Sequence, residues 1–202
     1  MVKGIMKVVL ASQSKRRSAI LSSCGIRHRV IVSSVRENMK GKRPSIIAIK
    51  NACLKAQSIR SSGYIIGADT VVLLGKRIIG KPRNAAHAKS MLKLMSGKTI
   101  AVYTGLCAID TKNKKMVTGY ERSEVKVKRI KPAEISRYFR LLGPYDKAGG
   151  FSIEGVGSFI FDDIKGSYFN VLGLPMAKLK ELFERLGVDI LHLVNFVSYP
   201  NG

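Results

Sequence analysis

The sequence predicts an α/β protein built on a mixed, strongly bent sheet. In the first half of the 202 residues, short apolar runs alternate with helix-type stretches, whereas segments typical of β hairpins dominate the middle. With 46% hydrophobic and 24% charged residues, the chain is long enough to bury a core. We therefore expect one domain over residues 1–202, with two lobes and a binding site in the cleft between them.

The first elements are expected to be strand, helix and strand. Residues 6–11 form a short apolar run, and a helix-like stretch over 16–24 ends at Gly25. Residues 29–34 resemble a second strand, which leads to Glu37. This alternation is typical of the start of an α/β fold.

A helix over 44–61 follows, since Pro44 can begin it and apolar residues recur at helical spacing. Its apolar face is expected to consist of Ile46, Ile47, Ile49, Ala52 and Leu54. An apolar strand over 65–72 then contains Asp69, and a turn at Gly75 leads into a hairpin return over 77–82.

The remaining chain alternates again between helices and strands. Asn84 can cap a helix that Gly97 ends, and Pro132 can begin another. The expected elements, in order, are a helix over 85–95, β segments over 99–110 and 116–127, a helix over 132–142, a glycine-rich region over 143–157, a strand over 158–164 and a helix over 175–186. The apolar tail 188–197, part of an extension over 188–202, is expected to pack on the body or on a second subunit.

Charge is the most unusual property of the chain. The formal net charge is +23, and between residues 1 and 109 only Glu37 and Asp69 stand against 21 Lys and Arg. The excess predicts an anionic partner, namely a nucleotide, nucleic acid or a membrane surface, and a plain solvated basic surface is the alternative. A carboxylate among cations is suited to hold Mg²⁺ while the cations hold polyphosphate. We therefore interpret the chain as an enzyme that acts on a phosphorylated anion.

Three segments could supply the groups for this chemistry. Ser12 to Arg17 follows a strand and starts a helix, where hydroxyls, backbone N–H groups and arginine forks bind phosphate; an ordinary serine cap is the alternative. Asp69 and Lys81 lie a hairpin apart, although aspartate at a strand end is often a turn former. The glycine-rich stretch 145–155 offers Lys147 to phosphate and Glu154 to a base edge, or is an ordinary loop.

Taken together, these segments resemble the Maf family of nucleoside triphosphate pyrophosphatases over residues 8–187. The resemblance is carried by six short motifs in the order of the family, at residues 10–17, 67–72, 80–82, 103–105, 146–149 and 170–175. It implies an elongated α/β fold, related to the inosine triphosphatase fold, with a deep cleft between two lobes. It also implies hydrolysis of a nucleoside triphosphate to the monophosphate and pyrophosphate, which would remove non-standard or surplus nucleotides from the cell. Some family members are linked to arrest of cell division.

The resemblance also assigns roles to individual residues. Asp69 would be the general base that activates water, and Glu37 with Asp69 would hold a divalent metal; whether Asp69 is base or metal ligand stays open. The metal would be Mg²⁺, with Mn²⁺ or Co²⁺ as alternatives. The substrate-binding residues would be Ser12, Arg16, Arg17, Lys55, Thr70, Lys81, Lys147 and Glu154.

Nucleotide preference is left open by the same comparison. Arg16 and Thr70 resemble members that prefer dTTP and UTP, whereas Glu154 resembles members that act on 7-methyl-GTP. A carboxylate favours a base edge with N–H donors, while an amide can both accept and donate.

The expected partner is the nucleoside triphosphate, in a cytoplasmic homodimer. Cys24, Cys53 and Cys107 lack disulfide or zinc spacing and indicate a reducing compartment, and no apolar stretch approaches a membrane span. A catalytically silent nucleotide sensor that uses the same pocket is one rival function. Binding of nucleic acid or regulation of cell division is another, suggested by the charge. Against the second, the chain has no nucleic-acid-binding motif and only 7% aromatic residues.

Overall fold

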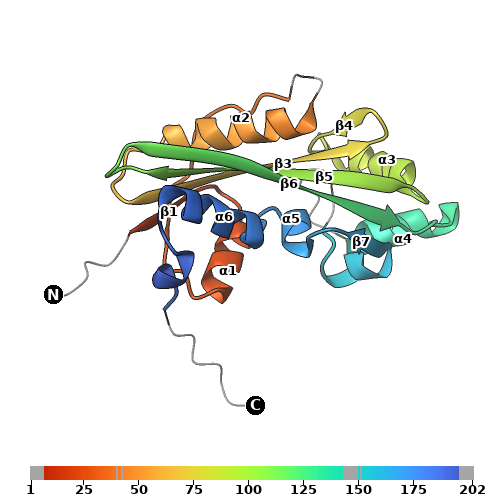
Figure 1. Cartoon of the computed structure of the whole chain (residues 1–202). Coiled ribbons are helices and arrows are strands. Elements are labelled where there is room, and N and C mark those ends of the chain that lie inside the picture. The colour runs from red at the N-terminus through yellow and green to blue at the C-terminus, as the bar shows by residue number, and fades with distance from the viewer. Residues whose placement is uncertain (1–6, 40, 42, 143–149, 151, 196–202) are drawn as a thin grey trace, which may run out of the picture.

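The computed structural model describes residues 7–39, 41, 43–142, 150 and 152–195, and these form a mixed α/β fold (Figure 1). Seven strands make one sheet in the order β2-β1-β3-β5-β6-β7, with β4 paired to β3. Strand β1 is parallel to β2 and β3, and the other pairings are antiparallel. The strands are β1 (Val8–Ala11), β2 (Arg29–Val30), β3 (Tyr64–Leu74), β4 (Arg77–Ile79), β5 (Thr99–Asp110), β6 (Lys115–Val127) and β7 (Phe161–Lys165).

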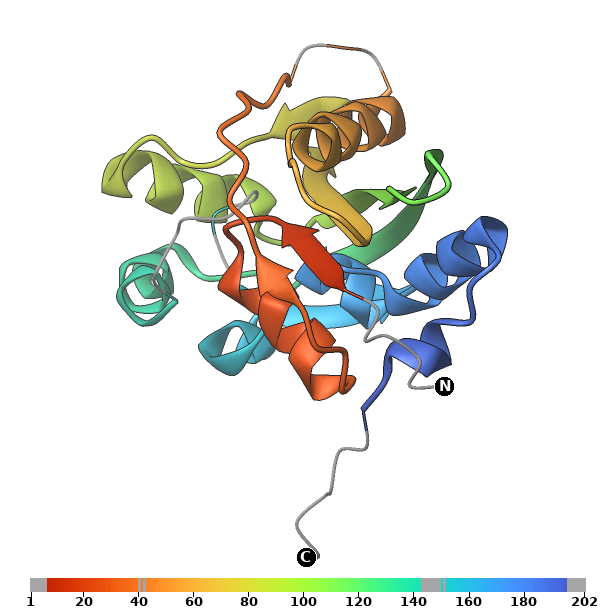
Figure 2. The same cartoon turned by 90° about the vertical axis from the view of Figure 1, so that its left-hand side faces the viewer.

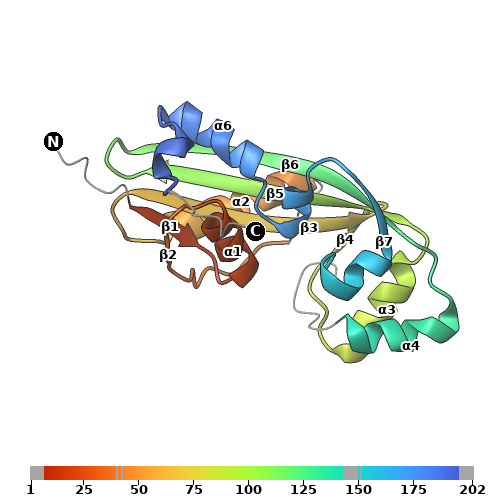
Figure 3. The ribbon, with the colours of Figure 1, turned by 90° about the horizontal axis from the view of Figure 1, so that it is seen from below.

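The helices cover both faces of the sheet. Helix α2 lies along one face, while α1, α5 and α6 lie on the other (Figures 1 and 2). Helices α3 and α4 pack together near β4 and β7 at one end of the elongated molecule (Figure 3). The helices are α1 (Lys15–Ser23), α2 (Pro44–Gln57), α3 (Ala85–Met95), α4 (Pro132–Leu141), α5 (Tyr168–Leu172) and α6 (Met176–Leu186), with 3-10 turns η1 (Gly155–Phe159) and η2 (Ile190–Leu193).

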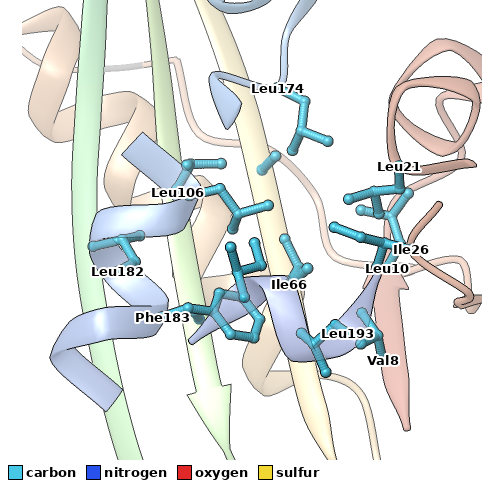
Figure 4. Packing of buried hydrophobic residues seen from close by; sticks show 14 of the residues in the cluster. Val8, Leu10, Leu21, Ile26, Ile66, Leu106, Leu174, Leu182, Phe183 and Leu193 are labelled. Atoms are coloured by element: carbon cyan, nitrogen blue, oxygen red, sulfur yellow. The ribbon is translucent and has the colours of Figure 1, made fainter. Parts of the chain in front are cut away.

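Apolar side chains form separate cores on the two faces of the sheet and at its end. The largest joins β1, β3 and β5 to α1 and α6, where Leu10, Leu106 and Phe183 are fully buried (Figure 4). A second core joins α3 and α4 to the nearby ends of the strands, and its members Leu92 and Ile160 are almost completely buried. A smaller core lies under α2. The long strands β3 and β5 run through these cores and connect them.

Helix α2 differs from the sequence expectation in its end and in its buried face. It ends at Gln57 rather than at residue 61, because the Ser58 hydroxyl donates to the Lys55 carbonyl and competes with the helical hydrogen bonds. Ile46 and Leu54, which were expected on the apolar face, are 41% and 42% exposed. The buried face instead consists of Ile47, Ala48, Asn51, Ala52, Lys55 and Ala56.

Three other expectations need correction. The strand expected over 29–34 is β2 alone: the Ile31 backbone N–H still donates to the Leu10 carbonyl, but the pairing goes no further because β1 ends at Ala11. The strand expected over 158–164 begins only at Phe161, since the preceding residues turn as η1, where the Ser158 hydroxyl donates to the Gly155 carbonyl. The expected glycine-rich region over 143–157 lies largely outside the described residues.

The described part of the C-terminal tail packs on the body of the protein, which was one of the two expected arrangements; the other was packing on a second subunit. Ile190 and Leu193 are buried in the core beside α6, and Val194 forms a bridge with Ile26. Among the described residues, no helix has the length and apolar character needed to cross a bilayer. Cys24, Cys53 and Cys107 are free thiols.

Candidate active site

The site centres on β3, where Asp69 is only 4% exposed and pairs with Gly105 of β5. Two glycines let α2 rest directly on these strands. A Cβ on Gly67 would lie 2.1 Å from the Ala52 oxygen, and one on Gly105 would lie 2.3 Å from the Ala48 carbonyl carbon. Contacts this short exclude any side chain at either position. The close approach brings the polar side chains of α2 within reach of Asp69.

Lys55 of α2 joins the two carboxylates that the charge pattern singled out. Its Nζ lies 2.7 Å from Asp69 Oδ1 and 2.7 Å from Glu37 Oε1. Burial alone would raise the pKa of Glu37, but the hydrogen bond and charge of Lys55, with the charges of Lys81 and Arg17, outweigh it and hold the pKa below its usual value. Glu37 and Asp69, 32 positions apart in the sequence, therefore share one site.

Asn51 is a site residue that the sequence analysis missed. Its Nδ2 donates to Asp69 Oδ2 at 2.8 Å and to the Asn38 carbonyl at 3.2 Å, while its Oδ1 accepts from the Asn38 backbone N–H at 2.9 Å. The sequence does contain one feature that could have identified Asn51. It lies four positions before Lys55, and residues four apart lie on one face of a helix. With Lys55 on Oδ1 and Asn51 on Oδ2, both oxygens of Asp69 accept a hydrogen bond.

Arg17 of α1 lies on the other side of this group and is buried. Its guanidinium donates to Ser12 Oγ at 3.1 Å, to the Ala68 carbonyl at 3.0 Å and to Thr70 Oγ1 at 2.9 Å, and its Nε donates to the Gly173 carbonyl at 2.7 Å. Burial lowers the pKa of Arg17, and the negative charges nearby partly offset this. The structure thus brings together Ser12, Arg17 and Thr70 next to Asp69.

The segment around Gly173 contacts Arg17 and Thr70 and helps to fix their positions. Gly173 ends α5 with φ +97°, and a Cβ there would meet Thr70 Oγ1 at 3.1 Å. Thr104, which the sequence analysis did not select as a site residue, hydrogen-bonds Thr70 Oγ1 at 3.0 Å and donates to the Asn170 carbonyl. Asn170 is fully buried and donates to the Val102 carbonyl of β5. Two residues of the 170–175 motif, Asn170 and Gly173, thus contact Thr104 and Arg17 through their carbonyl groups.

Arg16, the neighbour of Arg17 on α1, forms an ion pair with Glu154. Its Nη1 lies 3.1 Å from Glu154 Oε2 and 3.0 Å from Ser152 Oγ. Glu154 also lines a surface hollow of about 580 Å³, together with Phe161 and Tyr168. The two residues that indicated different nucleotide preferences are therefore in direct contact.

The cations expected around the site are only partly placed. Lys81 is exposed in the segment after β4, and its charge acts on Glu37. Lys147 lies outside the described residues. The described residues hold no cluster of three or more His, Cys, Asp or Glu that could bind a metal by themselves. The donor set of two carboxylates nevertheless fits Mg²⁺, which is commonly held by one or two carboxylates with substrate phosphates and water.

The fold and site define a class: an α/β protein with two lysine-linked carboxylates beside a cationic helix start, a combination suited to chemistry on phosphate anhydrides. The chain belongs to the Maf-like protein family, whose model matches residues 7–186.

Curated relatives span nearly the whole chain. A dTTP/UTP pyrophosphatase of Thermoanaerobacter sp. (strain X514) is 39% identical over 184 residues, which cover 89% of this chain and 96% of the relative. A dTTP/UTP pyrophosphatase of Bacillus cereus (strain Q1) is 42% identical over 190 residues, covering 92% and 98%. Among solved structures, the Ham1 protein of Staphylococcus aureus matches with a TM-score of 0.38 and 10% identity, over 60% of this chain and 71% of that chain.

Proposed function

We propose that this protein is a nucleoside triphosphate pyrophosphatase that hydrolyses dTTP and UTP to the monophosphate and pyrophosphate. The observation that carries the proposal is the pair of carboxylates, Glu37 and Asp69, each 2.7 Å from the Nζ of Lys55. Paired carboxylates in a cationic setting suit hydrolysis of a polyphosphate. The names and coverage of the curated relatives support the same reaction and suggest the two pyrimidine nucleotides.

In the proposed reaction, Asp69 acts as the general base. A water molecule attacks the α-phosphorus, and the Asp69 carboxylate takes one of its protons as the new oxygen–phosphorus bond forms. The bond from the α-phosphorus to the bridging oxygen breaks, and pyrophosphate leaves with the electron pair. Lys55 and Asn51 hold the two Asp69 oxygens, so the carboxylate is oriented before the substrate arrives.

We assign substrate binding to the cationic and polar groups around the carboxylates. Ser12, at the helix start, and Lys81 would contact the phosphates, with Lys147 as a further contact. Arg17 already makes four hydrogen bonds to protein groups, so its main contribution would be to hold Ser12 and Thr70 in place. The complete proposed set is Ser12, Arg16, Arg17, Lys55, Thr70, Lys81, Lys147 and Glu154.

Glu37 and Asp69 would hold the divalent cation, for which we propose Mg²⁺, with Mn²⁺ or Co²⁺ as substitutes. When bound, such a cation withdraws charge from phosphoryl oxygens and makes water more acidic. We further propose that the protein acts in the cytoplasm as a homodimer, and that its single domain is divided into two lobes with the nucleotide between them.

The deciding experiment measures pyrophosphate release with Mg²⁺ from the common nucleotides and from dTTP, UTP, ITP, 7-methyl-GTP and 5-methyl-UTP. We expect monophosphate and pyrophosphate in equal amounts, with dTTP and UTP among the best substrates. Release of inorganic phosphate instead would place the attack at the γ-phosphorus and contradict the proposed reaction. No turnover of any nucleotide would favour a nucleotide sensor or a nucleic-acid-binding protein, and salt-dependent DNA binding would then test the second of these.

A further inference from the structure

Asn51 is the one amide side chain on the otherwise largely apolar buried face of α2. It is 1% exposed, and Ala48 and Ala52 beside it are fully buried. A buried amide destabilises a protein unless its donors and acceptor are paired. In Asn51 both donors and the acceptor are paired, with Asp69 and Asn38. This pairing explains why a polar residue is tolerated at the position.

The contacts of Asn51 connect both carboxylates of the site. One Nδ2 hydrogen bond fixes Oδ2 of Asp69. The other, together with the Oδ1 contact, pairs the Asn51 amide with both backbone groups of Asn38 in the manner of two peptide groups. Asn38 directly follows Glu37, so this double hydrogen bond fixes the segment that carries Glu37. A single side chain therefore touches Asp69 and anchors the backbone next to Glu37.

Lys55 cannot replace this function. Its Nζ holds Asp69 Oδ1 and Glu37 Oε1, but an ammonium on a four-carbon chain fixes distance more than orientation. The amide of Asn51 sits one helical turn away and supplies a second, directional contact on the other oxygen. Two contacts on two oxygens prevent the carboxylate from rotating.

We propose that Asn51 is a positioning residue, which orients the Asp69 carboxylate and sets its separation from Glu37 so that the pair binds a divalent cation. The inference rests on the proposed function but makes a separate statement about metal affinity. Residues that orient metal ligands typically change affinity or activity by about 10–100-fold when removed.

Two variants of Asn51 test the proposal. Asn51→Leu keeps the approximate volume of the side chain but removes all three hydrogen bonds, and Asn51→Ala removes them together with most of the side chain. Gln57→Ala, an exposed position on the same helix, is the control. The measurements are kcat and KM for dTTP, the thermal midpoint, and the Kd of Mn²⁺ by electron paramagnetic resonance without nucleotide.

We expect kcat to fall about 10–100-fold and Mn²⁺ to bind about tenfold more weakly in both Asn51 variants, with KM changed less than about threefold. Values of kcat and Mn²⁺ Kd within about twofold of the unsubstituted protein would overturn the proposal. So would a failure of both variants to fold while Gln57→Ala folds, because Asn51 would then act on stability alone.

A double substitution separates this proposal from the proposed function. If Asn51 acts through Asp69, adding Asn51→Ala to Asp69→Asn should weaken Mn²⁺ binding less than Asn51→Ala does alone. Full additivity would contradict an action through Asp69. These affinities are measured without any substrate, so the Asn51 proposal can stand or fall even if the protein hydrolyses no nucleotide.

Discussion

Arg16 and Glu154 are in direct contact, 138 positions apart in the sequence, with Nη1 of Arg16 3.1 Å from Oε2 of Glu154. The sequence features of these two residues indicated different nucleotide preferences, so each seemed to contradict the other. In the structure they form one unit with Ser152, whose hydroxyl lies between them. The Glu154 side chain is 44% exposed, which leaves it accessible to a ligand in the adjacent hollow. The preference should therefore depend on the pair rather than on either residue alone.

The first prediction concerns Glu154→Gln. The amide retains an oxygen for Arg16 but loses the charge and gains a donor, which suits the carbonyl groups of thymine and uracil. We expect the ratio of kcat/KM for dTTP to that for 7-methyl-GTP to rise about tenfold, as for the gain or loss of one good hydrogen bond. Steady-state kinetics on both nucleotides measures it, with Glu181→Gln on α6 as the control. An unchanged ratio would show that Glu154 does not contact the base.

A second prediction concerns the removal of Lys55, whose ammonium compensates two negative charges. The Lys55→Met variant leaves the Glu37 and Asp69 carboxylates without a compensating positive charge between them. In EDTA, its free energy of unfolding should therefore be about 3 kcal/mol lower than that of the unsubstituted protein. Added Mg²⁺ can take over the compensation, so it should stabilise this variant more than the unsubstituted protein. Thermal unfolding with and without Mg²⁺ measures both effects. Lys50→Met, at an exposed position of α2, is the control. An equal response to Mg²⁺ in both proteins would argue against a shared metal site.

The central carboxylates could be predicted from the sequence because their charge is unusual. Glu37 and Asp69 stand out in a region of cations, and in the structure both carboxylates contact the Lys55 ammonium. The element order was largely predictable for a related reason, since apolar periodicity and glycine or proline punctuation are local properties.

The rest of the site depends on how elements meet, which local patterns do not reveal. Asn51 reaches Asp69 only because Gly67 and Gly105 let α2 lie against the backbone of β3 and β5. The same geometry rotates Ile46 and Leu54 into solvent, although periodicity favoured them as buried residues. Sequence hydrophobicity therefore identified the helix correctly but assigned part of its buried face incorrectly.

The lowered pKa of Glu37 predicts a pH-dependent contribution to stability. A carboxylate whose pKa lies below its unfolded value of 4.5 stabilises the fold above that pH, and the contribution is lost as the pH falls through the folded pKa. Since Glu37 is partly exposed, we expect Glu37→Gln to cost about 0.5–1 kcal/mol at pH 7 without metal. Chemical denaturation in EDTA from neutral to acidic pH should show this difference shrinking below pH 4.5. If the stability difference stayed constant across the pH range, the Glu37–Lys55 ion pair could not be its source. Glu184→Gln is the control, because it removes one partner of an exposed ion pair.

Asp69→Asn gives the sharpest test of the proposed reaction. The substitution keeps the size of the side chain but removes the base that would take the proton from water, so kcat should fall at least about 10³-fold. Nucleotide binding in EDTA should persist, because the proposed phosphate contacts come from other residues and no metal bridge is involved; calorimetry with dTTP measures it. The new amide would place a donor group against Lys55 or Asn51, so the thermal midpoint is recorded as well, with Glu184→Gln as the matched control. Hydrolysis near the unsubstituted rate would remove Asp69 from the role of base, and loss of binding together with activity would make it a ligand-holding residue instead.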